Sequence, residues 1–167
     1  MTLVDRVFTR IGASDRILEN KSTFFVELEE TKTIIEQATK HSLVIMDELG
    51  RGTSTFDGYS IAHSVLNYLV NTVQCRTLFT THYHMLVEDF RAIPEQVGLY
   101  HMKSAYEEQA DKIKFLYKFV EGVAPQSFGI YVAKLAGINV RNTDFSILYR
   151  KLCWSWRKEN QSSSTTG

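Results

Sequence analysis

The spacing of hydrophobic residues predicts that strands and helices alternate along the chain. Apolar and polar residues alternate over Val4–Ile11, a spacing typical of a strand. Over Ser22–Lys40, apolar residues recur every three or four positions, which predicts a helix. Leu43–Met46 is a short continuous apolar run, and such a run favours a strand buried on both faces of a parallel sheet.

The same pattern then repeats. Asp57–Gln74 carries the clearest apolar helical stripe of the chain, and Asp57 is expected to be the N-cap of that helix. Arg76–Thr81 is expected to form another buried strand. Because strand, helix and strand follow one another, the sequence predicts a layered α/β domain with a mainly parallel sheet and flanking helices.

The third part of the chain predicts a different arrangement. Val97–Tyr106 and Ile113–Val120 flank a polar segment, so these two stretches are expected to pair as antiparallel strands. Gln126–Ala136 is predicted to be a short helix that ends at Gly137, because glycine readily adopts the left-handed conformation that ends many helices. Residues 161–167 lack apolar side chains and are expected to be disordered.

Composition excludes several classes of protein. The 167 residues contain 19 basic and 19 acidic side chains, so a globally basic nucleic-acid binder is not indicated. Cys75 and Cys153 form no CxxC pair, which argues against a zinc site and a disulfide framework. The sequence has no signal peptide and no apolar run long enough for a membrane span, so we expect an intracellular protein with no membrane contact.

Candidate chemistry begins with two adjacent carboxylates, Asp47 and Glu48, directly after the apolar run Leu43–Met46. In open α/β sheets, ligands bind at the carboxyl ends of the strands. One acid at such a place can hold Mg²⁺, directly or through water, and the next can orient or deprotonate an attacking water. This is the layout of a Walker B site with a catalytic glutamate. The alternative is a buried strand followed by two surface acids.

The residues after the acid pair favour the functional interpretation. Gly50 and Gly52 permit a tight turn, and three hydroxyl residues, Thr53, Ser54 and Thr55, follow. His82 comes directly after the next predicted strand, where an imidazole can hydrogen-bond a γ-phosphate or the attacking water. In isolation His82 is equally consistent with a structural histidine, and His84 is expected to be structural.

Ser22 and Thr23 open the predicted helix over residues 22–40. A hydroxyl pair at a helix N-terminus caps the helix or offers donors to a phosphate. A capping box needs Glu or Gln three residues after the cap, and Glu27 lies four after Thr23. The spacing therefore does not favour capping as the full explanation of this pair.

Several blocks in order resemble one known family. DELGRGTSTFDGYSIA is preceded by STFFVELEET and followed by TLFTTHYH, and VDRVFTRIGASDRI and FLYKFVEGVAPQSFGIYVAKLAGI lie at the two ends. Together, over residues 3–139, they resemble the ATPase domain of the MutS mismatch-repair family, an ABC-type branch of the P-loop ATPases. Within the family the sequence is most similar to the larger subunit of the eukaryotic MutS-alpha heterodimer.

The resemblance implies a role for each candidate residue. Asp47 is similar to the Walker B aspartate that supports Mg²⁺ through water, and Glu48 to the catalytic glutamate. Residues 50–55 resemble the D-loop at the subunit interface, and His82 the switch histidine. Ser22 and Thr23 resemble the signature that completes the ATP site of the partner subunit.

The resemblance also implies a domain organisation. Residues 1–140 correspond to a partial ATPase domain, within which residues 122–139 resemble a helix-turn-helix that clasps the partner subunit. Residues 141–167 match nothing in the family and are expected to be a divergent, disordered tail. They carry five basic and two acidic residues.

Two short matches to family motifs are expected to be misleading. The chain contains no GxxxxGK[ST] P-loop, which in the family lies upstream of the matched region. Residues 20–23 imitate its end, but Asp15 and Asn20 stand where the glycines belong, and without them the backbone cannot wrap around phosphates. Residues 25–27 imitate the mismatch-reading Phe-x-Glu, yet inside a predicted helix they are expected to be core plus a solvated acid.

The sequence thus predicts an ATP-binding and ATP-hydrolysing module, with ATP and Mg²⁺, from a nuclear mismatch-repair protein. Its implied partners are mismatched double-stranded DNA, contacted through regions absent from this chain, and a second MutS-family subunit in a heterodimer. Without a P-loop, the chain is expected to be inactive on its own. The alternatives are a truncated, non-catalytic dimerisation fragment, a MutS relative acting in meiotic recombination, and an ABC-type chromosome protein.

Overall fold

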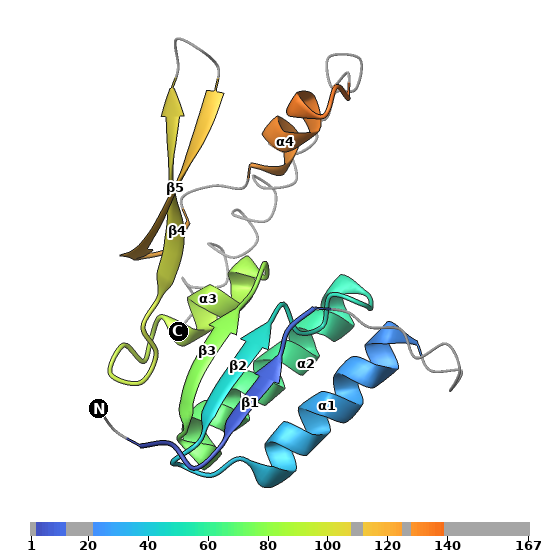
Figure 1. The fold of residues 1–167 in the computed structure, drawn as a ribbon, viewed down its shortest axis with the longest axis vertical. Helices are drawn as coiled ribbons and strands as arrows, with labels where there is room; N and C mark the ends of the chain where they lie inside the picture. Colours follow the sequence, from blue (N-terminus) through green and yellow to red (C-terminus); the bar gives the residue numbers. More distant parts are fainter. Residues whose placement is uncertain (1–2, 13–21, 108–111, 125–127, 139–167) are drawn as a thin grey trace, which may run out of the picture. The chain divides into compact units, whose positions relative to one another are not determined.

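The computed structural model describes residues 3–12, 22–107, 112–124 and 128–138 (Figure 1). The chain divides into two compact units, Met1–Leu99 and Tyr100–Gly167. The predicted tail, residues 141–167, lies outside the described residues, as do residues 20 and 21 of the imitated P-loop end.

The first unit is built on three parallel strands in the order β1-β2-β3. They are β1 (Val7–Arg10), β2 (Leu43–Asp47) and β3 (Arg76–Thr80). Helix α1 (Thr23–Gln37) connects the first pair, and α2 (Thr55–Tyr68) connects the second. The predicted parallel sheet with flanking helices is confirmed for this unit.

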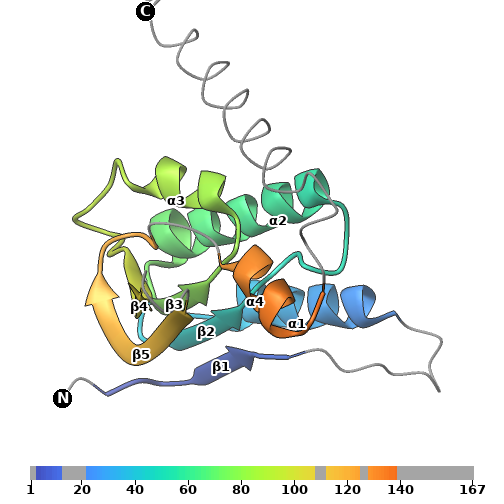
Figure 2. The same cartoon turned by 90° about the horizontal axis from the view of Figure 1, so that it is seen from above.

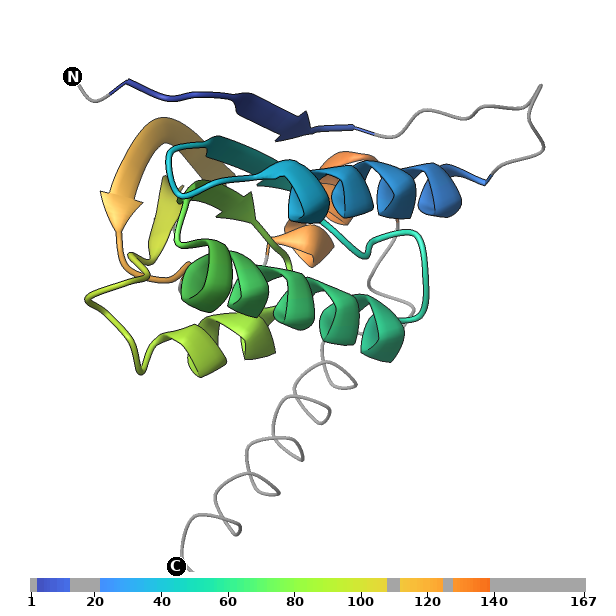
Figure 3. The same cartoon turned by 90° about the horizontal axis from the view of Figure 1, so that it is seen from below.

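Both connecting helices cover the same face of the sheet, as Figures 2 and 3 show. The reason lies in the alternation of side chains along β2. Val44 and Met46 point to the helices and are fully buried, and they share one apolar cluster with Ile34 of α1 and Val65 of α2. The connections β1–α1–β2 and β2–α2–β3 have the same handedness, and the strands follow one another in order across the sheet. Both helices therefore lie on the same face of the sheet.

The opposite face of the sheet is less buried than the sequence predicted. The prediction that Arg76–Thr81 is a buried strand is correct for the strand but wrong for its burial, since Leu78 is 57% exposed. β3 lies at the edge of the described sheet, and its alternate residues face away from the helices. Of the two faces of β2, the one without helices is half-buried.

Both long helices have a serine as their N-cap. Ser22 is the N-cap of α1 and accepts the N–H of Phe25 at 3.2 Å. Ser54 is the N-cap of α2 and accepts the N–H of Asp57 at 3.2 Å, so the prediction of Asp57 as the cap is wrong. Asp57 lies in the first turn instead, where its negative charge stabilises the positive end of the helix dipole.

The end of the α2 region differs from a regular helix. After Tyr68 the chain continues as a π-helix, η2 (Leu69–Val73), which ends at Gln74 in the left-handed conformation. The predicted extent of this helical segment is therefore confirmed at its C-terminal end. The spacing of apolar residues does not predict the change from α-helix to π-helix.

A short helix that the sequence analysis did not predict follows β3. α3 (His84–Phe90) packs on α2 through Leu86 and Phe90. The hydroxyl of Tyr59 on α2 donates to the carboxylate of Asp89 on α3. This hydrogen bond, aided by burial and by the Asp89 charge, raises the pKa of Tyr59 to about 12.

The second unit contains the predicted antiparallel pair and a short helix. β4 (Tyr100–Glu107) and β5 (Lys112–Glu121) form a two-stranded ribbon, with an irregularity in the ladder between Lys103 and Ser104. α4 (Gly129–Leu135) is the predicted short helix, and Gly137, with φ of +82°, ends it as expected. The N–H of Ile138 returns to the carbonyl of Ala133 at 3.0 Å, which closes the last turn.

The predicted helix-turn-helix over residues 122–139 is described only in part, because residues 125–127 and 139 lie outside the described residues. Across the described part of the chain, the helices lack the length and apolar character that crossing a bilayer requires.

We expect Ser54→Ala to lower the free energy of unfolding by about 1 kcal/mol, because it removes the N-cap of α2. Ser64→Ala is the matched control, since Ser64 lies in the interior of the same helix, exposed, and bonds only backward to the carbonyl of Ser60 among its described contacts. Urea denaturation of both variants measures the difference. Equal losses in the two variants would contradict the assignment of the cap.

Candidate functional site

The two adjacent carboxylates lie at the carboxyl end of the central strand. Asp47 is the last residue of β2 and pairs in register with Thr80, the last residue of β3. The Thr80 hydroxyl donates to the Asp47 carboxylate. The N–H of Glu48 reaches both the carbonyl and the hydroxyl oxygen of Thr80, each at 3.2 Å. Asp47 and Glu48 are therefore fixed against the end of the neighbouring strand.

Glu48 adopts an unusual backbone conformation. Its φ is +48°, in the left-handed region that few residues other than glycine occupy. The chain thus turns sharply away from β2 at this acid. The Glu48 carboxylate accepts a hydrogen bond from Arg51 at 2.8 Å, and the Arg51 side chain is largely exposed. An exposed ion pair of this kind contributes little to stability, so it leaves the carboxylate available for other partners.

His82 follows β3 by two residues and is exposed. Since Thr80 is the register partner of Asp47, the sheet brings His82 to the same edge as the acid pair. Its ring packs against that of Tyr83, with the centroids 4.2 Å apart. His84 is the exposed first residue of α3.

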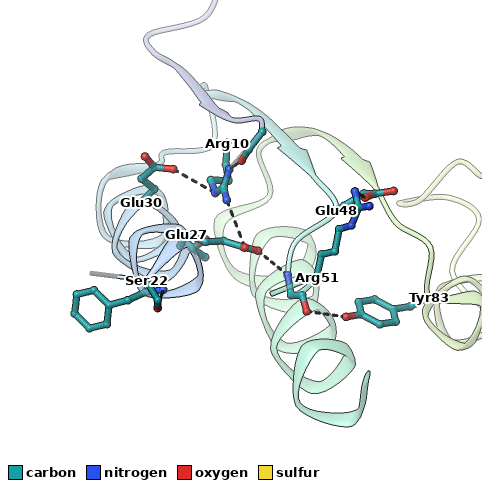
Figure 4. A network of polar contacts seen from close by, with 11 residues as sticks. Arg10, Ser22, Glu27, Glu30, Glu48, Arg51 and Tyr83 are labelled. Atoms are coloured by element: carbon teal, nitrogen blue, oxygen red, sulfur yellow. Dashed lines mark hydrogen bonds and ion pairs between the residues drawn. The ribbon is translucent and has the colours of Figure 1, made fainter. Parts of the chain in front are cut away.

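Gly50 is held by hydrogen bonds at both its N–H and its carbonyl group. Figure 4 draws these two bonds as dashed lines from Glu27 and Tyr83. The Gly50 N–H donates to Glu27 Oε1 of α1 at 2.7 Å. Its carbonyl oxygen accepts the Tyr83 hydroxyl at 2.9 Å. This peptide therefore joins the segment after β2 to α1 and to the segment after β3.

Close backbone packing explains why glycine occupies two positions here. Gly50 has φ of +90°, and a Cβ there would lie 2.5 Å from the carbonyl oxygen of Gly58. A Cβ on Gly58 would lie 2.2 Å from the Tyr83 hydroxyl oxygen and 2.3 Å from the Gly50 oxygen. Only residues without a side chain allow this approach. Gly52 is less constrained, because a Cβ there would first meet Phe24 at 3.0 Å.

Glu27 is buried, which corrects the expectation that residues 25–27 are core plus a solvated acid. Val26 and Glu27 are the buried residues of that tripeptide, whereas Phe25 is 49% exposed. Glu27 Oε2 lies 3.4 Å from Arg10, which is itself buried. Arg10 Nε also lies 3.2 Å from Glu30, an ion pair without hydrogen-bond geometry. Glu27 stays inside because Arg10 and the Gly50 N–H satisfy its charge.

Three residues of this hydrogen-bonded network were not predicted as part of the site: Arg10, Glu27 and Tyr83. Burial first, and then the negative charges of Glu27 and Glu48, raise the pKa of the Tyr83 phenol. The phenol therefore stays neutral and remains a hydrogen-bond donor to Gly50. The sequence does carry one sign that Glu27 is buried. Its spacing places it on the same helical face as Thr31 and Ile34, and the structure shows that all three are buried.

Two of the predicted hydroxyl residues are helix caps in this structure. Ser22 caps α1, although the spacing of Glu27 did not favour capping there. In Figure 4, Ser22 lies at the start of α1, on the other side of Glu27 from Glu48. Ser54 caps α2, while Thr23 and Thr53 are half-buried. The structure thus gathers Asp47, Glu48 and His82 at one sheet edge, and it places Ser22 and Thr23 at a separate helix end.

Comparison with known proteins identifies the family. The model of the family MutS domain V matches residues 1–144. The chain belongs to the MutS family. It is 54% identical over 143 residues to the DNA mismatch repair protein Msh6 of Gallus gallus. The matched residues make up 83% of this chain and 11% of that protein.

Other relatives in the MutS family give the same result. The DNA mismatch repair protein MSH7 of Arabidopsis thaliana is 51% identical over 146 residues, which cover 83% of this chain and 13% of that protein. The MutS protein of Anaeromyxobacter sp. is 52% identical over 136 residues, covering 81% of this chain and 15% of that protein. The chain therefore spans only 11–15% of the length of these relatives.

The donors at the end of β2 are of the kind that could bind Mg²⁺ together with ligands from elsewhere. Among the described residues, no three acidic, histidine or cysteine side chains come together to hold a metal. Asp47 offers one carboxylate beside the Thr80 hydroxyl. Mg²⁺ is commonly bound by one or two carboxylates, with water and substrate phosphates as the other ligands, and this donor set fits that mode.

The contact between Gly50 and Gly58 gives a test with an unusual sign. Helix propensity predicts that Gly58→Ala stabilises α2 by about 0.5–1 kcal/mol. We expect a loss of roughly 1–3 kcal/mol instead, because the new methyl group overlaps Tyr83 and Gly50. Urea denaturation measures the change, and Ser60→Ala, an exposed site on α2, is the control. A stabilised Gly58→Ala protein would contradict the close packing.

Proposed function

We propose that this chain is the part of a MutS-family ATPase module that hydrolyses ATP, within an ABC-type P-loop ATPase. The observation that carries the proposal is the position of Asp47 and Glu48. They stand side by side at the carboxyl end of the central parallel strand, beside the strand end that leads to His82. Nucleotides bind at this edge of open α/β sheets.

Each residue of the edge has a distinct role in the proposal. Asp47 supports Mg²⁺, directly or through water, and the metal when bound neutralises charge on the transferred phosphoryl group. Glu48 orients the attacking water and accepts its proton. His82 hydrogen-bonds the γ-phosphate. The turn at Glu48 and the exposed Arg51 pair leave the Glu48 carboxylate at the surface, where a water can reach it.

The remaining parts of the nucleotide site have to come from other residues. The sequence holds no GxxxxGK[ST] segment, so a phosphate cradle of backbone N–H groups is not supplied by this chain. We propose that Ser22, Thr23 and the loop of residues 50–55 face the ATP site of a second MutS-family subunit. The positive end of the α1 helix dipole favours an anion there.

The proposed setting is a nuclear mismatch-repair heterodimer. This rests on the family and on the Msh6 relatives, which are DNA mismatch repair proteins. Mismatched DNA would be contacted by regions outside this chain, and ATP hydrolysis would drive a change of state after recognition.

A second candidate is a non-catalytic dimerisation fragment. Two observations favour it: the missing phosphate cradle and the exposed apolar residues of α4 and its end, namely Val132, Leu135 and Ile138. In this alternative the residues near Asp47 keep the family geometry without turning over ATP.

The first test uses full-length chicken Msh6 in which the matched 143 residues are replaced by those of this chain, assayed with a second MutS-family subunit. Glu48→Gln should lower kcat for ATP hydrolysis at least about 100-fold, because it removes the general base. ATP affinity should stay within about twofold of the unsubstituted protein, because the change removes a group that acts in the transition state and not one that binds ATP in the ground state. Glu36→Gln, on the exposed side of α1, is the matched control. Undiminished turnover in Glu48→Gln would refute the role.

The second test asks whether these residues hold a phosphate site on their own. We expect the isolated 167-residue chain to bind Mg²⁺-ATP with a Kd weaker than about 1 mM, which corresponds to about 4 kcal/mol of binding free energy. Isothermal titration calorimetry measures it, with the chimeric full-length protein as the positive control. Micromolar binding by the isolated chain would show that a phosphate site exists within these residues.

A further inference from the structure

The buried peptide of Gly50 is the junction between the two loops that carry the proposed catalytic residues. Gly50 lies two residues after Glu48, and its carbonyl accepts the hydroxyl of Tyr83, the residue next to His82. Its N–H donates to Glu27 of α1. Neither Glu27 nor Tyr83 has a role in the proposed function above.

We propose that Glu27 and Tyr83 are positioning residues that hold Glu48 and His82 in one fixed relation through the Gly50 peptide. This inference rests on the proposed ATPase function. Neither residue is placed against substrate. Each bonds to a backbone group of Gly50, and the backbone then holds the catalytic side chain in place.

The two bonds are suited to this role because both are buried and one is charge-assisted. The carboxylate of Glu27 accepts the Gly50 N–H at 2.7 Å, within the short range of hydrogen bonds to charged groups. Glu27 is only 6% exposed, so water does not compete for it. Arg10 of β1 lies against the other carboxylate oxygen and anchors the acid to the sheet.

The conformation of Glu48 gives a reason why positioning is needed. A left-handed glutamate costs free energy relative to an extended or helical one, and such a conformation persists only where the surroundings determine it. On one side, Thr80 fixes the N–H of Glu48. On the other side, the anchored Gly50 peptide fixes the chain two residues later, and the contact with Gly58 prevents Gly50 from moving toward α2.

Tyr83 links this anchor to His82 by adjacency and by ring packing. The Tyr83 hydroxyl holds Gly50 while its ring lies 4.2 Å, centroid to centroid, from the His82 ring. Its raised pKa keeps the hydroxyl protonated, so the bond persists throughout the neutral range. A displaced Tyr83 would therefore move both the Glu48 loop and the His82 ring.

The decisive variant is Tyr83→Phe in the chimeric full-length protein, because it removes one oxygen and keeps the ring. We expect kcat to fall about 10-fold, since small displacements of a catalytic group cost large factors in rate, while KM for ATP stays within about twofold. Tyr68→Phe, the same chemical change at the last residue of α2, should change neither value.

A pair of variants at Glu27 isolates its hydrogen bond from its charge. Glu27→Gln and Glu27→Ala both remove the negative charge beside Arg10, but only Gln retains an oxygen that accepts the Gly50 N–H. We expect Gln to preserve at least about half of kcat and Ala to lose at least about 10-fold. Glu36→Ala is the control on the same helix.

Three outcomes distinguish the possibilities. If Tyr83→Phe and Glu27→Ala lower the thermal midpoint but leave kcat of the folded protein unchanged, the residues are structural only and the inference is wrong. If both lower kcat and their effects in the double variant are less than multiplicative, they act on one shared element, as proposed. If Glu48→Gln itself leaves turnover unchanged, the proposed function fails first, and this result is visible before any variant of Tyr83 is made.

Discussion

The arrangement at the sheet edge depends on one close backbone contact, between Gly50 and Gly58. Because neither residue has a side chain, the loop after β2 can lie directly on the first turn of α2. This approach brings the Gly50 peptide within reach of Glu27 on one side and Tyr83 on the other. Any side chain at either position would separate the loop from the helix and break both hydrogen bonds, so the geometry of Glu48 is set by two residues that carry no chemistry.

Local pattern predicted most of the fold. The continuous apolar run before Asp47 and the apolar stripe after it specify β2 and α2, since burial of Val44, Met46 and Val65 against one another requires these spacings. The errors have physical causes. Asp57 was expected to be a cap because its side chain suits that role, but Ser54 precedes it by three residues and accepts the N–H of Asp57 itself, so the helix begins before Asp57. The exposure of Leu78 follows from the position of β3 at the sheet edge, which composition does not reveal.

The candidate site was predictable only where its residues act through their own side chains. Asp47, Glu48 and His82 follow strand ends, and the parallel order of strands then brings them together without further information. Glu27 and Tyr83 act on a backbone group 23 and 33 residues away in sequence, so no local pattern links them to Gly50. Residues of this kind are found only when the three-dimensional hydrogen-bond partners of a buried peptide are followed.

In the proposed function, the structure separates two tasks that a complete ATPase combines. The residues near Asp47 supply two carboxylates and an imidazole, which suit metal support and proton transfer, but the carboxylates repel a triphosphate unless a metal ion or hydrogen-bond donors offset their charge. The donors at the start of α1 lie at a different place, beyond Glu27 from the acid pair. In the proposed function, an anion held near Ser22 is therefore not the phosphate toward which Glu48 directs a water. Glu27 lies between these two places, and its carboxylate accepts the N–H of Gly50 in the loop after β2. The helix whose N-terminus is proposed to face one phosphate site thus also holds the loop of the proposed base of another, and this connection would be a physical link between the two sites.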